Sequence, residues 1–252
     1  MQPGRPLLPP PPPKRSPATL IIIVAVAAVL LLVVAGAGIF LFVNRDRITG
    51  SGGAHRSARP SYGPIYRKLP SCDTMPATAF ASLMPGGMLS SNVHRDGTED
   101  DGPNAICQWD NIDADNKQPP EDRIVHLTMN GYSDYFGSPF DAAKKALATD
   151  RSDSDGVVGK TDHSFTYGPV TELSGLGTGA FAQNYTVTDG FPRGGTGISL
   201  QVENVVVELS FEGGDGEDDQ EHPMDPAKAS QAAMAVAHDV VAWLASCADC
   251  KS

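Results

Sequence analysis

The most apolar part of the chain lies near its N-terminus. Residues 20–43 carry no charged or polar side chain. As an α-helix, this segment would be roughly 36 Å long, enough to cross a hydrocarbon core about 30 Å thick. Only a helix lets a single segment satisfy its own backbone hydrogen bonds inside lipid. The pattern therefore predicts a single transmembrane helix, with the lipid bilayer as its partner.

A secretory signal peptide is the alternative interpretation of this run. Ala35, Gly36 and Ala37 form a small-residue trio of the kind that signal peptidase recognises. The apolar run continues past the trio to Val43, and it is longer than the roughly 7–15 residues of a signal-peptide core. We therefore expect an anchor that is not cleaved.

Beyond residue 68, apolar and polar residues alternate in a way that predicts strands and helices of a globular domain. Alternation predicts strands at 105–110, 123–130, 180–187, 197–203 and 205–211, with a tight turn at Glu203 and Asn204. Helix signals predict a short helix at 76–84, one opened by Ser138 and Pro139 that runs through 142–148, and a long amphipathic one from 226 to about 246. The acidic segment 213–225 is predicted to be a solvated loop. Together these elements predict an α+β domain over residues 69–252, with a largely antiparallel sheet and helices packed on one side.

The segments that flank the apolar run are predicted to lack a packed core. Residues 1–19 contain five consecutive prolines at positions 9–13, which favours an extended, disordered tail. The same prolines, together with Arg5, leave open a role as a ligand for an SH3-type groove. Residues 44–68 are rich in Gly, Ser and Arg, which predicts a flexible basic stalk.

The distribution of charge and cysteine predicts the orientation in the membrane. The first 19 residues contain three basic residues and no acidic one, whereas all acidic residues and all four cysteines follow the apolar run. Cysteine pairs suit an oxidising compartment, and long C-terminal domains translocate largely regardless of their charge. We expect a cytoplasmic N-terminus in the cell membrane and an extracytoplasmic domain.

The charge of the domain also excludes one class of partner. Residues 70–252 contain 10 basic and 29 acidic residues, a formal net charge of −19. Nucleic-acid binding depends on cationic surfaces that neutralise phosphates. The composition therefore argues against a nucleic-acid partner.

Three short motifs resemble a known family. Cys72-Asp73 before a short helix, Cys107-Gln108-Trp109 on a strand, and the segment 173–181 (LSGLGTGAF) resemble a large actinobacterial family of extracytoplasmic lipoproteins and membrane-anchored proteins. This is a domain-of-unknown-function family, distantly similar to the extracellular sensor domain of a mycobacterial serine/threonine kinase. The resemblance covers roughly residues 66–246. It implies an envelope location, a Cys72–Cys107 disulfide and no established activity.

The four cysteines allow three pairings. We favour Cys72–Cys107 together with Cys247–Cys250 as a local clasp, the latter pair being an addition to the family pattern. A redox-active pair is the alternative for Cys247 and Cys250. The pair follows the predicted helix, however, where the helix dipole would raise the pKa of a thiol. A four-cysteine zinc site is a further alternative, which the wide spacing of Cys72 and Cys107 disfavours.

Signals for metals, cofactors and catalysis are weak. Residues 151–162 follow the pattern of a calcium-binding loop, but Arg151 stands where the first anionic ligand is required, so a solvated turn is favoured. The six histidines have no metal-ligand spacing, and no hydrolase, zinc-protease or nucleotide-binding motif is present in the sequence. We therefore predict no metal, no cofactor and no catalytic residue.

The sequence as a whole predicts a non-catalytic, membrane-anchored binding or sensor-like domain of the cell envelope. Its expected partner is an envelope protein or a small ligand. The alternative is an envelope enzyme, or an enzyme accessory, whose site is assembled from residues scattered along the chain.

Overall fold

The computed structural model of the protein describes residues 62–76, 81–98, 100–112, 121–135, 137–162, 164–188, 192–217 and 220–252. The chain divides into two compact units between Arg59 and Pro60, and the described residues all belong to the second. The predicted tail, the transmembrane helix at 20–43, most of the stalk and most of the helix predicted at 76–84 lie outside them. Within the described part of the chain, no helix is long and apolar enough to cross a membrane.

One antiparallel sheet of nine strands organises the domain, in the order β1-β2-β3-β8-β7-β6-β5-β4, with β9 paired to the end of β8. The strands are β1 (Met88–Arg95), β2 (Asn104–Asp110), β3 (Glu121–Gly131), β4 (Thr161–Asp162), β5 (Phe165–Leu173), β6 (Gly179–Val187), β7 (Arg193–Val202), β8 (Val205–Glu217) and β9 (Gln220–Pro223). Two α-helices accompany it, α3 (Pro139–Gly156) and α4 (Pro226–Ser246), together with two 3₁₀ turns, η2 (Cys72–Thr74) and η3 (Ala248–Cys250). The prediction of an α+β domain with an antiparallel sheet is confirmed.

The larger core lies between the sheet and α4. Alternate residues of β8 point to this side, and they pack with the apolar face of α4 in one cluster that includes Val205, Val207, Leu209, Phe211, Ala233, Val236, Val240 and Leu244. Helix α4 begins where the sequence predicted, because Asp225 caps it by accepting hydrogen bonds from the backbone N–H groups of Ala227 and Lys228. Burial of this alternating face removes apolar area from water and so stabilises the domain.

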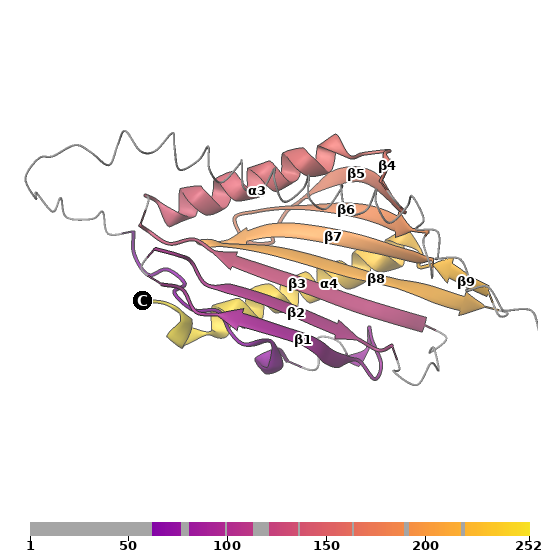
Figure 1. Ribbon diagram of the computed structural model, residues 1–252, viewed down its shortest axis with the longest axis horizontal. Coiled ribbons are helices and arrows are strands. Elements are labelled where there is room, and N and C mark those ends of the chain that lie inside the picture. Colours follow the sequence, from indigo (N-terminus) through magenta and orange to yellow (C-terminus); the bar gives the residue numbers. More distant parts are fainter. Residues whose placement is uncertain are drawn as a thin grey trace, which may run out of the picture. The chain divides into compact units, whose positions relative to one another are not determined.

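The smaller helix covers the opposite face of the sheet. Val206 of β8 and Phe181 of β6 pack against Ala143 and Leu147 of α3 in a separate cluster. Since neighbouring residues of a strand point to opposite faces, α3 and α4 lie on opposite faces of the sheet, as Figure 1 shows. The prediction that the helices pack on one side is wrong, because consecutive valines at 205–207 make β8 apolar on both faces. We call the face that carries α3 the front face.

The predicted strands are present, but the acidic segment after β8 is not a simple solvated loop. Strand β8 continues to Glu217 and forms a hairpin with β9. Arg123 of β3 is 5% exposed. Its guanidinium donates to the carbonyl of Gly214 at 2.6 Å and to Asp215 at 2.7 Å. The extension of β8 thus supplies the acceptors that a buried cation requires.

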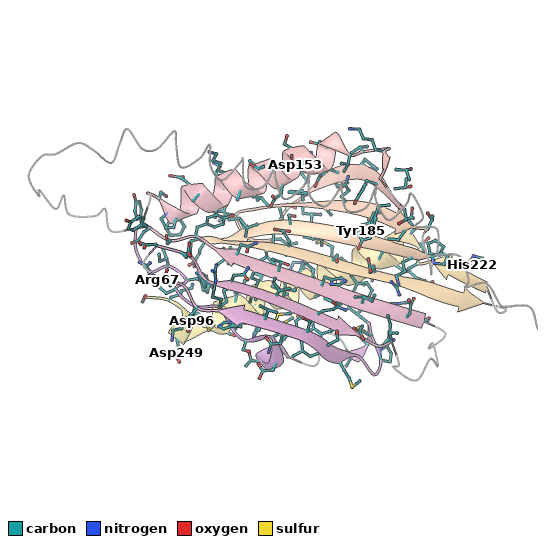
Figure 2. All side chains as sticks on the ribbon, in the orientation of Figure 1. Arg67, Asp96, Asp153, Tyr185, His222 and Asp249 are labelled. Carbon is teal, nitrogen blue, oxygen red and sulfur yellow. A yellow bond between two sulfur atoms is a disulfide. The ribbon has the colours of Figure 1, made fainter. Side chains whose placement is uncertain are left out.

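The two ends of the described chain are tied together. Ile65 and Tyr66 are buried, so residues 62–68, predicted to be the end of the stalk, belong instead to the domain. Tyr66 forms a β-bridge with Lys251, and the backbone N–H of Arg67 donates to the carbonyl of Cys250 at 2.9 Å. Figure 2 shows Arg67, Asp96 and Asp249 at this end of the molecule, and His222 at the other.

Candidate functional site

Helix α3 forms the wall of a cleft on the front face. Ser138 caps the helix by accepting a hydrogen bond from the backbone N–H of Asp141, and Pro139 occupies the first helical position. The helix packs on the sheet through the buried Ala143 and Leu147. The space beside that contact, between α3 and the adjoining ends of β6 and β7, is open to ligands.

This α3 cleft has a volume of about 470 Å³, within the range of small-molecule sites. Its lining comes from α3, β5, β6, β7 and the turns next to them: Phe140, Asp141, Lys144, Leu147, Ala148, Arg151, Glu172, Thr178, Gly179, Ala180, Phe181, Gln201 and Glu203. Leu147 and Phe181 are buried and make an apolar floor. Charged side chains occupy the margin.

The turn between β5 and β6 closes one side of the α3 cleft. Gly177 has a positive φ of 56°, and a Cβ at this position would overlap the carbonyl oxygen of Gln201. Glycine is therefore required for the turn to lie against β7. This turn belongs to the 173–181 motif that carried the family resemblance.

Arg151 covers the floor from the helix side. Its guanidinium lies 5.8 Å from the centre of the Phe181 ring, in a cation–π arrangement. It donates to Glu172 at 2.7 Å and forms an ion pair with Asp155. Hydrogen bonds to these two carboxylates raise the pKa of Arg151 above its ordinary value, so this side chain remains a cation.

Glu203 lies at the other end of the α3 cleft, in the predicted turn between β7 and β8. It is the one non-glycine residue with positive φ, 54°, among the described residues. Its Oε1 accepts a hydrogen bond from Lys251 Nζ at 2.7 Å. Its Oε2 is buried and has no hydrogen-bond partner in the described part of the chain. A strained residue with an unsatisfied buried oxygen is a typical feature of a ligand site.

A group of titratable side chains lies elsewhere on the front face. Burial, followed by the charges of Asp150 and Glu208, raises the pKa of Tyr132. Burial, followed by the charge of Asp153, raises the pKa of Asp150; Asp153 also lies on α3, as labelled in Figure 2. Burial and then the charge of Asp150 raise the pKa of Glu208, although Glu208 still contacts solvent. Two neighbouring carboxylates repel each other when both are ionised, so the pKa of the second one to ionise is raised.

A second cleft of about 440 Å³ lies beside the N-terminal end of α3. Tyr132 lines it together with Asn104 and Asn130, whose side chains are hydrogen-bonded to each other at 2.7 Å. Its lining is more polar than that of the α3 cleft.

Tyr185 of β6 forms a further polar contact of the front face, at the end of the sheet where Figure 2 labels it. Its hydroxyl donates to Glu212 at 2.7 Å, and its ring lies close against Gly195. Burial, followed by the charge of Glu212, raises the pKa of Tyr185. This tyrosine stays protonated and acts as a hydrogen-bond donor.

Both favoured disulfides, Cys72–Cys107 and Cys247–Cys250, are present, and no cysteine is free. The second pair follows the C-terminal end of α4 and closes the 3₁₀ turn η3. There it holds the segment whose Cys250 carbonyl accepts hydrogen bonds from Arg67 and Lys68. None of the four cysteines lines the α3 cleft, and both pairs connect parts of the scaffold.

The segment 151–162 is not a calcium loop, and it is not a solvated turn throughout. Helix α3 continues to Gly156, beyond the predicted end at Ala148. The ion pair between Arg151 and Asp155, one helical turn apart, supports this extension despite poor helix formers. Among the residues that the structure describes, no three potential ligands form a metal site, and His126 and His238 are exposed.

The residues of the α3 cleft escaped the sequence analysis because their signals are individually weak. Phe181, Gln201 and Glu203 belong to predicted strands and their turn, and Arg151 was considered only as a defect in a calcium loop. The 173–181 motif was the one signal that pointed to this part of the molecule.

No protein-family model matches the chain, and no curated protein matches it. Among solved structures, the chain is similar to the extracellular domain of PknH from Mycobacterium tuberculosis, with 12% sequence identity and a TM-score of 0.44. The similarity covers 66% of this chain and 90% of that chain. The resemblance to the lipoprotein family stays a prediction.

Proposed function

We propose that the protein is a membrane-anchored, extracytoplasmic binding domain of the cell envelope, which holds a small ligand in the α3 cleft without turning it over. The observation that supports this most is the make-up of the cleft. A buried apolar floor with a few charged groups at its margin is typical of ligand pockets.

A link between the α3 cleft and the N-terminal segment supports a sensor-like role. Glu203 lines the cleft and binds Lys251, whose ammonium lies 4.6 Å from the centre of the Tyr66 ring. The next residue, Asn204, binds the backbone of Tyr66. Because the first part of the predicted stalk leads directly into residues 62–66, a ligand that shifts Glu203 would also shift the point where the stalk joins the domain.

Native mass spectrometry of the full chain, extracted with its surrounding lipid from native membranes, tests the binding role. Ala148 is exposed on α3 and lines the α3 cleft, so Ala148→Trp should fill the cleft without disturbing the core. Thr149→Trp places the same bulk on the next exposed residue, outside the cleft. We expect a small molecule to co-purify with the wild type and with Thr149→Trp, but not with Ala148→Trp. Equal loading of all three chains would contradict the proposal.

The anchor and its orientation need a separate test, because residues 20–43 lie outside the described residues. An uncleaved transmembrane helix should keep the whole chain in the membrane pellet after an alkaline wash. Labelling from outside intact cells should reach Lys144 and Lys160 in the domain. Release by the wash, or labelling only after lysis, would contradict the proposed topology.

The raised pKa values of Asp150 and Glu208 favour a second candidate, an enzyme that uses this pair for general acid–base chemistry. In that case the Asp150→Asn and Glu208→Gln variants would each abolish turnover of an envelope component supplied as an extract. The Ala148→Trp variant would still turn it over. Turnover that is absent in the wild type, or that survives in both carboxylate variants, excludes this candidate.

A further inference from the structure

The α3 cleft carries information on the chemistry of its ligand. Resting on the proposed function, we infer that this ligand has an apolar body and one cationic head group, of the protonated-amine class, which binds the carboxylate of Glu203.

The floor of the cleft is suited to the apolar body. Phe140 is half-buried and Ala148 is exposed, and both line the cleft beside the buried Phe181 and Leu147. Gly179 leaves room beside Leu147, since a Cβ there would already contact the leucine side chain. A ligand with a ring or a short hydrocarbon chain would remove the exposed parts of Phe140 and Ala148 from water, whereas a wholly polar ligand would leave them exposed.

The head group is defined by the unsatisfied oxygen of Glu203. Lys251 donates to Oε1, but Oε2 is buried without a donor among the described residues. Burying a carboxylate oxygen is unfavourable unless a donor reaches it. A ligand that brings an N–H donor to Oε2 would therefore gain a charge-assisted hydrogen bond that no described residue makes.

The charges around the α3 cleft favour a cation over an anion. Three carboxylates line it, Asp141, Glu172 and Glu203, against the two cations Lys144 and Arg151, while Lys251 pairs with Glu203 without lining the cleft. Arg151 is already engaged by two carboxylates, Glu172 and Asp155. The negative charge of the domain adds a field that attracts cations and repels anions.

The position of Glu203 is set before the ligand arrives. Its backbone occupies a left-handed conformation, and its side chain is held by Lys251. The Gln201 side-chain amide donates to the backbone carbonyl of Glu203 at 2.8 Å. A residue whose backbone is held by Gln201 and whose carboxylate is held by Lys251 loses little conformational entropy when it binds a head group.

Three probes with the same naphthalene body test the head group directly: 1-naphthylmethylamine, 1-naphthalenemethanol and 1-naphthoate. Their dissociation constants would be measured by titration calorimetry on the full chain in lipid nanodiscs, with empty nanodiscs as the blank. For the wild type we expect the amine to bind at least ~10-fold more tightly than the alcohol, and the carboxylate most weakly. Glu203→Gln should remove most of the advantage of the amine while changing alcohol binding less than about 3-fold.

The variants of Ala148 and Thr149 separate this inference from the proposed function. If Ala148→Trp abolishes binding of all three probes and Thr149→Trp does not, the α3 cleft is the binding site. In that case, equal affinity for amine and carboxylate, or an amine preference that survives in Glu203→Gln, would overturn the inferred ligand class alone. Binding that Ala148→Trp leaves unchanged, or no binding of any probe, would overturn both.

Discussion

Asn204 binds the backbone of Tyr66 at two points across 138 residues of sequence. Its Oδ1 accepts from the Tyr66 N–H at 2.8 Å, and its Nδ2 donates to the Tyr66 carbonyl at 3.0 Å. The same Nδ2 donates to the carbonyl of Tyr132 at 2.9 Å. A single buried side chain thus joins the N-terminal segment, the turn between β7 and β8, and the end of β3.

Asn204→Ala should therefore be strongly destabilising. It removes three hydrogen bonds and leaves buried backbone groups of Tyr66 unsatisfied, so we expect a loss of about 3 kcal/mol in the free energy of unfolding. Urea denaturation followed by tryptophan fluorescence measures this, since both tryptophans, Trp109 and Trp243, are buried in the domain. Asn92→Ala, on the exposed edge strand β1, is the control and should change stability by less than about 0.5 kcal/mol.

The two disulfides should differ in their contribution to stability. Cys72 and Cys107 are 35 residues apart in sequence, and Cys247 and Cys250 only 3. In the chain-entropy model, closing the long loop is worth about 4 kcal/mol and the short one about 2 kcal/mol. Paired Cys→Ala substitutions, compared by urea denaturation, should reproduce this order. An equal or reversed effect would show that η3 depends on its disulfide for contacts as well as for loop closure.

The backbone at Glu203 allows a matched comparison of two substitutions. Glu203→Ala and Glu203→Gly both remove the contact with Lys251, but only alanine keeps a Cβ at a φ of 54°. Relief of this strain outweighs the greater freedom of glycine in the unfolded chain. We expect Glu203→Gly to be up to about 1 kcal/mol more stable than Glu203→Ala in urea denaturation. A less stable glycine variant would show that the turn carries no strain.

The raised pKa values of Asp150 and Glu208 predict a pH dependence of stability. Above the folded-state pKa values, the folded domain holds both carboxylates ionised at a cost that the unfolded chain does not have. As the pH falls through those values toward the unfolded ones near 4, the folded state takes up protons first and becomes relatively more stable. The double variant Asp150→Asn/Glu208→Gln should therefore be more stable than the wild type at pH 7. This difference should shrink as the pH falls to about 4.

Asp215 provides the opposite case on the same domain. Burial alone would raise its pKa, but hydrogen bonds from Arg123 and Lys228 outweigh burial and lower it. Stability from this group is present above its usual pKa and is lost as the pH falls through the lowered folded-state value. Asp215→Asn should therefore be less stable than the wild type at pH 7. If both sets of variants shifted stability in the same direction with pH, the assigned causes would be wrong.

The sequence alone predicted the elements whose signals are local. Asp225 and Pro226 predicted the start of α4, and alternation predicted β2, β3, β6, β7 and β8, because caps and two-residue periodicity act over a few residues. It also predicted the turn at Glu203 and Asn204, and the family resemblance led to the Cys72–Cys107 pair.

Tertiary structure decided which residues meet. Strands β1 and β5 are polar, so the alternation of apolar and polar residues that would predict them is faint. They form because neighbouring strands supply their hydrogen bonds. Helix α3 lies on the front face because it packs against Val206 and Phe181 there. The sequence of a strand shows that such a residue is apolar, but it does not show which helix will cover it. The α3 cleft arises from the same cause: Arg151, Phe181 and Glu203 become neighbours only when the antiparallel order brings α3, β6 and the turn after β7 together. Local sequence determines the elements, whereas the pairing of distant strands determines the site.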